Sequence, residues 1–251
     1  MNRLVKMIGC LLLAFSLQAQ SNIELYPTNW FVGMKWNKVQ VIVRNKENVF
    51  SNATIRLNYP GVQLTKVHAF ENKKYLALDL LVSPSAKPGK INIQLTSAAS
   101  AAVLTWELKP RRTGMGKTFA NGVSAKDFIY LLMPDRFSNG NPSNDVVSGY
   151  KDNLVNRKDP IKRHGGDLEG VANNLDYLHD MGVTAIWMTP VLENDMPLQS
   201  EQAGMMAGYH GYWFTNHYAI DKRLGGENAY KKLIDAAHAK GIKIIQDAVY
   251  N

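Results

Sequence analysis

The stretch FIYLLMPD, residues 128–135, decides how the second half of the chain is interpreted. Six residues without a charge run from Phe128 to Met133 and end at a proline. Such a run is typical of a short parallel strand that is buried on both faces. We therefore expect this half to contain a sheet that is covered by helices.

The segments that follow alternate between helical and strand patterns. Apolar residues recur every three or four positions in residues 168–181 and 230–237, which predicts two helices with one apolar face each. Residues 185–188 and 242–249 have strand patterns, and Gly241 stands where helices commonly end. Strand, helix, strand, helix, strand indicates βαβ architecture, as a doubly wound sheet or a barrel.

The first half of the chain has the pattern of short strands separated by turns. The β-rich runs are residues 39–44, 53–57, 75–82, 91–95 and 103–108. This spacing predicts an all-β sandwich over residues 21–110. Proline, glycine and basic residues then indicate a linker at 111–125, so that the α/β domain occupies 126–251.

The amino-terminal residues 1–20 have the pattern of an export signal. Arg3 and Lys6 precede an apolar run that is too short for a stable membrane span. The only cysteine, Cys10, lies inside this segment, so disulfides, thiolate metal sites and cysteine nucleophiles are excluded from the rest. We expect an exported protein of the periplasm or cell surface without a membrane span.

The net charge of +8 raises the question of a nucleic-acid partner. The basic residues are scattered singly along the strand patterns, and no basic run or helical stripe follows them. No glycine-rich phosphate loop of the G-x-G-x-x-G or Walker type follows the run at 128–133 either. These patterns disfavour both nucleic-acid binding and a nucleotide fold.

Five ordered segments carry polar and aromatic residues around the predicted strand ends. They are DRFSNGNPSND at 135–145, HGGDL at 164–168, GVTAIWMTP at 182–190, GYHGYW at 208–213 and DAVYN at 247–251. Together they resemble the landmarks of the α-amylase superfamily, and IELYPTNWFVGMK at 23–35 resembles the start of the N-terminal domain of cyclomaltodextrinases and neopullulanases.

This resemblance implies a specific architecture for the second half. In that superfamily the catalytic domain is an eight-stranded (β/α) TIM barrel with its site on the loops at the strand C-termini. The chain then holds a truncated barrel of about three βα units. The resemblance also implies that the N-terminal domain helps the protein to dimerise, so we expect that the protein can form a homodimer.

The loop after the first predicted strand, together with the HGGDL segment, is a candidate calcium site. Calcium binds about six to eight oxygens, and amide, carboxylate and backbone oxygens here could supply six. The resemblance assigns the same positions. As an alternative, the loop residues bond their own backbone as turn residues, and Asp167 caps a helix. The candidate ligands are Asn139, Asn141, Asn144, Asp145, Gly165 and Asp167.

The segment around Tyr209 to Trp213 is a candidate sugar site. A pyranose needs flat aromatic faces for its C–H surface and fixed donors for its hydroxyls. By resemblance, Tyr212 stacks under the glucose whose bond is cut, His210 bonds its hydroxyls, and Tyr209 belongs to the same site. The alternative is a hydrophobic loop that packs on the barrel rim, which is how we interpret Trp213.

Asp247 ends an apolar strand pattern, so its carboxylate is expected at the edge where the site lies. By resemblance it orients an arginine beside the nucleophile, and Asn251 supports the site. Retaining glycoside hydrolysis needs two carboxyl groups about 5 Å apart. The resemblance places these after later strands, so we assign no catalytic residue in this chain and interpret residues 193–195 as a solvated loop.

These observations predict retaining hydrolysis of α-1,4 bonds in maltodextrins, cyclomaltodextrins, pullulan or starch by the parent enzyme, with this 251-residue chain inactive. Two alternatives stay open: a transglycosylase of the same superfamily, and a non-catalytic α-glucan-binding protein that works through the sandwich. The aromatic residues Trp30, Phe31 and Trp36 could stack on sugar, but we expect them to fill the sandwich core.

Overall fold

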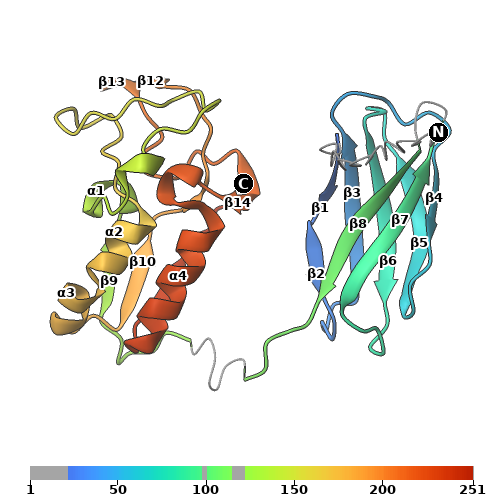
Figure 1. Cartoon of the computed structure of the whole chain (residues 1–251), viewed down its shortest axis with the longest axis horizontal. Coiled ribbons are helices and arrows are strands. Elements are labelled where there is room, and N and C mark those ends of the chain that lie inside the picture. Colours follow the sequence, from blue (N-terminus) through green and yellow to red (C-terminus); the bar gives the residue numbers. More distant parts are fainter. Residues whose placement is uncertain (1–21, 98–100, 115–121, 251) are drawn as a thin grey trace, which may run out of the picture. The chain divides into compact units, whose positions relative to one another are not determined.

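The computed structural model describes residues 22–97, 101–114 and 122–250. The predicted export signal at 1–20 and Asn251 lie outside these residues. The chain divides into two units, with the boundary between Arg111 and Arg112 (Figure 1). Each unit has its own hydrophobic core.

The first unit is a β-sandwich of two four-stranded sheets, ordered β1-β3-β6-β5 and β2-β8-β7-β4. All pairs are antiparallel except β2 with β8, which is parallel. The strands are β1 (Ile23–Tyr26), β2 (Asn29–Phe31), β3 (Lys38–Asn45), β4 (Thr54–Leu57), β5 (Val62–Ala69), β6 (Tyr75–Val82), β7 (Gly89–Thr96) and β8 (Ala101–Lys109).

Alternation of apolar and polar residues builds the core between the two sheets. In β3 and β7 every second side chain is buried, which directs the valines of β3 and Ile91, Ile93 and Leu95 of β7 inward. Trp106 is fully buried, and its Nε1 donates a 2.8 Å hydrogen bond to the Pro27 carbonyl. Its indole therefore fills the core without leaving a polar atom unpaired.

The expectation that Trp30, Phe31 and Trp36 fill this core is wrong for two of the three. Trp30 packs against the core, but Phe31 is 39% exposed and Trp36 is 70% exposed. Phe31 ends the short edge strand β2, and Trp36 lies outside the strands, between β2 and β3.

The second unit is built on a parallel sheet in the order β15-β10-β9. Its strands are β9 (Ile129–Leu132), β10 (Ala185–Met188) and β15 (Lys243–Gln246). The helices are α1 (Pro134–Phe137), α2 (Leu168–Asn173), α3 (Leu175–Asp180) and α4 (Gly226–Ala239), with single turns η1 (Pro142–Asn144) and η2 (Lys222–Leu224). Short antiparallel pairs join β11 (Leu192–Glu193) to β14 (Asn216–Ile220) and β12 (Gln199–Glu201) to β13 (Gly204–Met206).

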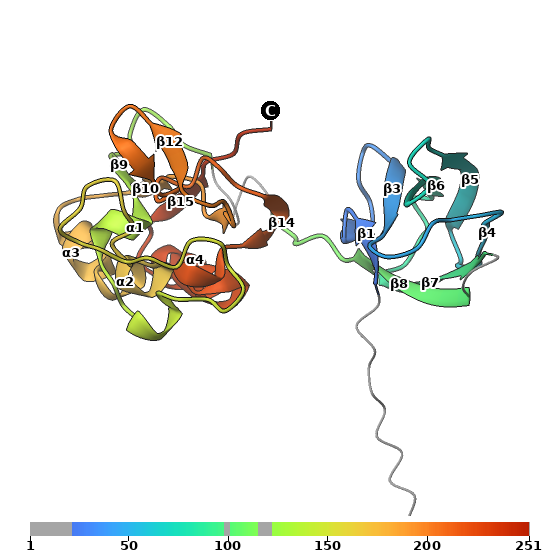
Figure 2. The ribbon, with the colours of Figure 1, turned by 90° about the horizontal axis from the view of Figure 1, so that it is seen from above.

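Helices α2 and α4 lie side by side against one face of this sheet (Figure 1 and Figure 2). Ile186 and Met188 are buried with the apolar faces of these helices. The alternate residues Ile129, Leu131 and Trp187 are exposed, so the expectation that the strand in residues 128–133 is buried on both faces is wrong. Among the described residues, helices cover only the Ile186 face.

The predicted helix over 168–181 is two helices, α2 and α3, with a break at Asn174. Asn174 leaves helical geometry, and its Nδ2 donates a 2.8 Å hydrogen bond to the Gly170 carbonyl. An asparagine side chain that bonds the backbone competes with the helix, which explains the break. In the described residues no helix is both long and apolar enough to cross a membrane.

Candidate functional site

The C-terminal ends of the three parallel strands meet at one edge of the sheet. Leu132, Met188 and Gln246 are aligned in register across β9, β10 and β15. The polar residues that follow each strand, among them Asp135 and Asp247, therefore leave the sheet on the same side. This edge gathers most of the residues that the sequence singled out.

The loop that carries Tyr209, His210 and Tyr212 packs tightly against the end of β10. Gly211 has a φ of +87°, and a Cβ atom there would lie 2.1 Å from the carbonyl oxygen of Pro190. Only glycine combines this left-handed conformation with so close an approach of two backbones. The glycine thus fixes where its neighbours His210 and Tyr212 leave the loop.

Tyr212 and Asp247 are brought together although 35 residues separate them. The Tyr212 hydroxyl donates a 2.8 Å hydrogen bond to Asp247 Oδ2, and this bond is the main cause that raises the pKa of Tyr212. Trp187 Nε1 donates to the same oxygen at 3.3 Å. The Tyr212 ring stays about two-fifths exposed, so it offers an accessible aromatic face at the sheet edge.

Trp187 is a site residue that the sequence analysis missed, because it was assigned only to the strand pattern at 185–188. The signal was the alternation within β10, which points Trp187 away from its buried neighbours Ile186 and Met188. Its indole lies on the same exposed face of the sheet as Ile129 and Leu131.

The surroundings of His210 favour a neutral imidazole with its proton on Nε2. The backbone N–H of Tyr212 donates a 3.0 Å hydrogen bond to Nδ1, so the proton of the neutral ring is on Nε2. Burial, followed by the charge of Arg163, lowers the pKa of His210. The ring stacks on Tyr212 with centroids 5.8 Å apart and an interplanar angle of 26°. His210 can thus donate through Nε2 to a hydroxyl oxygen at neutral pH.

Tyr209 is held by a different partner from Tyr212. The Arg136 guanidinium lies 3.8 Å from the centre of the Tyr209 ring, and it also donates to the carbonyls of Lys162 and Pro160 at 2.8 and 2.7 Å. Tyr209 meets His210 edge-on at 5.5 Å. It therefore supports the histidine, while Tyr212 occupies the position beside Asp247.

Asp135 holds the loop that precedes α2. Its carboxylate is buried, pairs with Arg136 at 3.1 Å and accepts the backbone N–H of His164 at 3.0 Å and of Gly165 at 3.3 Å. Burial is the main cause that raises the pKa of Asp135, and these hydrogen bonds oppose it. Its oxygens are committed to the HGGDL loop, which is a structural task.

The sequence analysis also missed a buried ionic network, which reaches the start of the aromatic loop, residues 208–213. Arg163 pairs with Asp152 at 3.2 Å, and Arg223 pairs with Asp221 at 2.9 Å. Arg223 Nη1 further donates to the Asp152 carbonyl at 2.7 Å, which links the two pairs. All four residues are at most 7% exposed. Opposite charges two positions apart, at 221 and 223, were the local signal, whereas the other pair joins separate loops.

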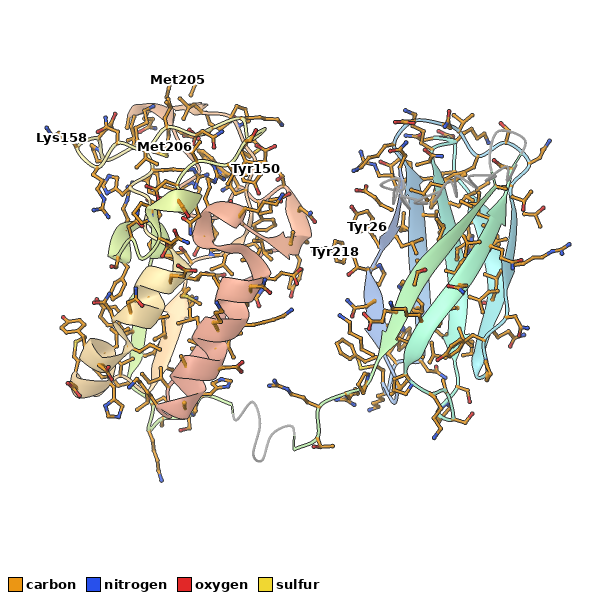
Figure 3. The ribbon with its side chains drawn as sticks, in the orientation of Figure 1. Tyr26, Tyr150, Lys158, Met205, Met206 and Tyr218 are labelled. Carbon is orange, nitrogen blue, oxygen red and sulfur yellow. The ribbon has the colours of Figure 1, made fainter. Side chains whose placement is uncertain are left out.

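The network extends to Asn194, so the interpretation of residues 193–195 as a solvated loop is wrong. Asn194 is buried, its backbone N–H donates to Asp221 Oδ2 at 3.0 Å, and its Nδ2 donates to the Gly208 carbonyl at 2.8 Å. Glu193 accepts a 3.0 Å hydrogen bond from the hydroxyl of Tyr150, which Figure 3 labels. The ionic network thus anchors the start of the aromatic loop at Gly208.

The candidate calcium ligands come together around η1 and the start of α2. Asn139 Nδ2 donates to Asp145 Oδ1 at 2.8 Å, and Asn144 Nδ2 donates to Asp167 Oδ2 at 3.2 Å. A Cβ atom on Gly165 would lie 2.8 Å from Asp145 Oδ1, so the glycine backbone borders the same carboxylate. The backbone N–H of Asn141 donates to Asp167 Oδ2 at 2.9 Å, so all six predicted ligands lie together.

Two oxygens of this cluster have no hydrogen-bond partner. Asn139 Oδ1 and Asn144 Oδ1 are buried from solvent and unpaired within the structure. Buried polar atoms are nearly always satisfied, and an exception calls for a partner such as an ion. Amide and carboxylate oxygens are suitable ligands for calcium, so these residues fit that ion. No cluster of three or more His, Cys, Asp or Glu suited to a metal occurs in the described part of the chain.

Two of the predicted ligand side chains, Asn141 and Asp167, also bond backbone groups. Asn141 Oδ1 caps η1 by accepting the Ser143 backbone N–H at 3.1 Å and its hydroxyl at 2.6 Å. Asp167 accepts the backbone N–H groups of Gly140 at 3.0 Å and Gly170 at 2.6 Å, which makes it the N-cap of α2. The structure therefore contains both alternatives that the sequence suggested for these residues: Asn141 forms a turn, and Asp167 caps a helix.

Comparison with known proteins gives matches for both units. Residues 129–251 match the family model for the α-amylase catalytic domain, and residues 24–112 match the model for the cyclomaltodextrinase N-terminal domain. These two matches confirm the resemblance to the α-amylase superfamily and to the N-terminal domain of cyclomaltodextrinases.

Three curated relatives illustrate the match. The β/α-amylase of Paenibacillus polymyxa is 44% identical over 127 residues, which are 51% of this chain and 10% of the relative. A cyclomaltodextrin glucanotransferase of Klebsiella oxytoca is 37% identical over 50% of this chain and 19% of its own length. Neopullulanase 2 of Thermoactinomyces vulgaris is 39% identical over 49% of this chain and 19% of its own length. The chain thus spans between a tenth and a fifth of the length of these relatives.

Proposed function

Because the two matched segments show that the chain belongs to the α-amylase superfamily, we propose that the whole protein hydrolyses α-1,4-glucosidic bonds in maltodextrins, cyclomaltodextrins, pullulan or starch, with retention of configuration. The observation that carries this proposal is the arrangement of Tyr212, His210 and Asp247 at the C-terminal edge of the parallel sheet.

This arrangement suits a glucose unit. The partly exposed ring of Tyr212 offers a flat face for the C–H surface of the sugar, and its hydroxyl bond to Asp247 fixes the tilt of the ring. His210 presents an Nε2–H donor to a sugar hydroxyl, because Nδ1 is already occupied. A rigid platform with oriented donors holds the glycosidic bond in position for attack, which lowers the entropic barrier.

The nucleophile and the acid are proposed to lie outside these 251 residues. Asp135 is committed to the loop before α2, and Asp247 accepts two hydrogen bonds from Tyr212 and Trp187. A retaining mechanism needs two carboxyl groups about 5 Å apart across the bond, and neither aspartate is available for that task. We expect the 251-residue chain by itself to be inactive.

The sheet is proposed to continue into an eight-stranded (β/α) barrel in the whole protein. The wall of such a barrel is a parallel sheet with helices on its outer face, and alternate side chains of its strands fill the interior. The sheet of this chain is parallel, has helices on one face, and exposes Ile129, Leu131 and Trp187 on the other. Asn251, outside the described residues, is proposed to support the site at the end of β15.

Calcium is proposed as the structural cofactor. Asn139, Asn144, Asp145, Gly165 and Asp167 would hold it, and Asn141 would contribute from the same turn. The bound ion would supply positive charge to the buried amide and carboxylate oxygens and would cross-link the loop after β9 to the start of α2.

We also propose that residues 1–20 export the protein to the periplasm or cell surface, and that it forms a homodimer through the N-terminal domain.

A transglycosylase is the second candidate, because one relative is a cyclomaltodextrin glucanotransferase. Water and sugar hydroxyls would compete for the same glycosyl intermediate, so the two functions differ in the acceptor.

The proposal is tested by incubating the whole protein with maltoheptaose, cyclomaltodextrin and pullulan. Reducing ends should appear, and proton NMR of the first products should show the α-anomer. Longer oligosaccharides in place of new reducing ends would favour transglycosylation. Binding of the glucan without any change in it would show a non-catalytic binding protein and would refute the proposed hydrolysis.

A further inference from the structure

Two buried polar atoms beside the aromatic loop have no hydrogen-bond partner within the described residues. They are Nη2 of Arg163, which is 7% exposed, and Oδ1 of Asn194, which is 2% exposed. Another atom of each side chain is paired: Arg163 Nε donates to Asp152 at 3.2 Å, and Asn194 Nδ2 donates to the Gly208 carbonyl at 2.8 Å. Buried polar atoms are nearly always satisfied, so this donor and this acceptor indicate a bound partner.

Both residues line one small cavity at the C-terminal edge of the parallel sheet. The rest of its lining comes mainly from the residues that follow β9 and β10 and from the aromatic loop. The cavity measures about 10 Å³. One water molecule needs about 10 to 15 Å³ of such space, so the cavity has room for one water and for no larger ligand.

A ligand here must accept a hydrogen bond from Arg163 and donate one to Asn194. A metal cation does neither, and the guanidinium would repel it. A halide ion accepts but cannot donate, and it would lie near the carboxylates of Asp135 and Asp221, which also line the cavity. Water does both, and buried waters typically make about three hydrogen bonds to polar groups that are otherwise unsatisfied. The cavity therefore suits water by its chemistry as well as by its size.

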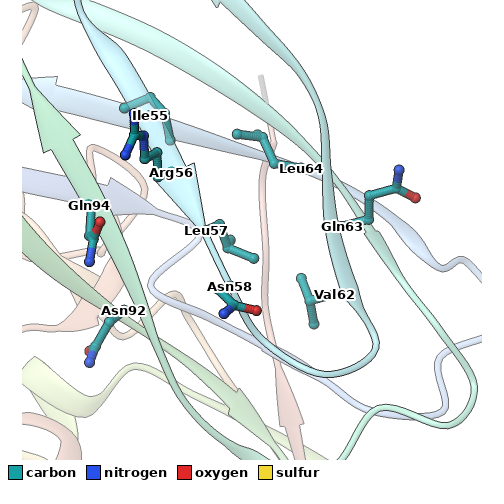
Figure 4. Close-up of a pocket in the computed structure, with 9 residues that line it drawn as sticks. All are labelled: Ile55, Arg56, Leu57, Asn58, Val62, Gln63, Leu64, Asn92 and Gln94. Carbon is teal, nitrogen blue, oxygen red and sulfur yellow. The ribbon is translucent and has the colours of Figure 1, made fainter.

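A larger groove in the first unit carries no such requirement. It measures about 850 Å³ and lies between the edge strands β4 and β5 (Figure 4). Amides of Asn58, Gln63, Asn92 and Gln94 line it together with aliphatic side chains. None of its lining residues, all of which the structure describes, has a buried polar atom without a partner. Nothing in this groove points to a particular ligand.

Asn194 also supports the aromatic loop. A Cβ atom on Gly208 would lie 2.6 Å from Asn194 Nδ2, so the loop backbone packs directly on this side chain. Gly208 precedes His210 by two residues. Burial, followed by the charge of Arg163, lowers the pKa of His210, so Arg163 acts on the same imidazole. A partner that joins Arg163 to Asn194 would therefore fix the loop from which His210 extends.

We propose that one buried water molecule joins Arg163 Nη2 to Asn194 Oδ1, and that Asn194 is thereby a positioning residue for the sugar-binding face of His210 and Tyr212. The bridge connects the segment before α2 to the segment after β10. The positioning role rests on the function proposed above, whereas the water site rests only on the two side chains and the cavity. Asn194 acts through the loop backbone and makes no contact with the sugar.

The water site is tested by a high-resolution crystal structure of the whole protein. Density for one water within about 3.2 Å of both Arg163 Nη2 and Asn194 Oδ1 is expected. The density should be absent in Asn194→Leu, because leucine has a similar size but offers no hydrogen bond. A direct bond between the two side chains, or no ordered water between them in the wild type, would overturn the site.

The positioning role is tested by steady-state kinetics on maltotriose. Asn194→Leu should raise KM at least about fivefold, because His210 is no longer held where it meets a sugar hydroxyl. Lost stability alone would lower the folded fraction, and with it the apparent kcat, but would leave KM unchanged. Asn174→Ala is the matched control: its Nδ2 also donates to a glycine carbonyl at 2.8 Å, at the break between α2 and α3, and its KM should stay at the wild-type value.

If Asn194→Leu does not fold, Arg163→Lys serves for the same two measurements, because it keeps a positive charge beside Asp152 but has no Nη2 donor. Wild-type KM in the variant, or an equal rise of KM in Asn174→Ala, would overturn the positioning role. A wild-type protein that hydrolyses no α-glucan would instead refute the proposed function together with the positioning role, and the density between Arg163 and Asn194 would still decide the water site.

Discussion

Replacement of Asn144 by alanine should remove most of the calcium response of the whole protein and change the calcium-free protein little. Without the ion, the Asn144 side chain has one bond to Asp167 at 3.2 Å and one buried oxygen without a partner. A hydrogen bond to a charged group contributes about 1.5 to 3 kcal/mol, and an unsatisfied buried polar atom costs about 1 to 3 kcal/mol. The two effects of the substitution therefore offset each other to within about 1 kcal/mol.

When calcium is bound, we expect the substitution to lower the free energy of unfolding. At a concentration about a hundred times its Kd, the ion stabilises the native state by about 2.7 kcal/mol, which raises the Tm of the calcium-binding unit by several degrees. Asn144→Ala removes one ligand and leaves the Oδ1 of Asn139 unpaired, so most of this increment should disappear. The measurement is scanning calorimetry of wild type and variant in calcium and in chelator, at one protein concentration.

Asn153→Ala is the matched control. Its side chain bonds both backbone groups of Val147 and is not a predicted ligand, so its removal should cost about 1 to 3 kcal/mol equally with and without calcium. The calcium increment itself should stay near the wild-type value. Equal increments in Asn144→Ala and wild type, or equal wild-type melting curves in calcium and chelator, would refute the assignment of this cluster to calcium.

Three further predictions concern the site and the fragment. Tyr212→Ala should lower kcat on maltodextrins at least tenfold through lost positioning, with Tm nearly unchanged because the ring is partly exposed; unchanged kinetics would make Tyr212 only a packing residue. The pKa of His210 is lowered, so the neutral donor persists at pH 7, and KM should rise only as the pH falls through that lowered pKa; a KM rise centred above the ordinary His value would contradict this. The same sign means that His210 costs stability as the pH falls below its unfolded value of about 6.5. Limited proteolysis of the 251-residue chain should leave the proposed domain 21–110 as a resistant piece ending between Pro110 and Gly116, without release of reducing sugar from starch; a fragment that is compact throughout and active would contradict this.

The sequence predicts those parts of the fold in which periodicity is undisturbed. Strands β3 and β7 alternate cleanly and were located within a few residues. Strand β5 was missed, because its register shifts between Leu64 and Lys66 and its polar residues hide the alternation. The break at Asn174 was missed for a related reason: the apolar spacing continues across it, while the side chain bonds the backbone.

The candidate site was predictable where ordered motifs mark it. The resemblance to the α-amylase superfamily is confirmed by the matches over 24–112 and 129–251. The contacts of Asp247 with Trp187, and of Arg163 with Asp152, were not predictable, because they join different loops through the tertiary fold. Periodicity indicates which face a side chain takes, but not which partner it meets there.

A crystal structure of the whole protein with a bound maltooligosaccharide tests the central claim most directly. The account predicts a glucose ring stacked on Tyr212, a sugar hydroxyl within hydrogen-bond distance of His210 Nε2, and both at the C-terminal edge of β9, β10 and β15. A maltooligosaccharide that binds the second unit elsewhere, with no sugar at Tyr212, would contradict it.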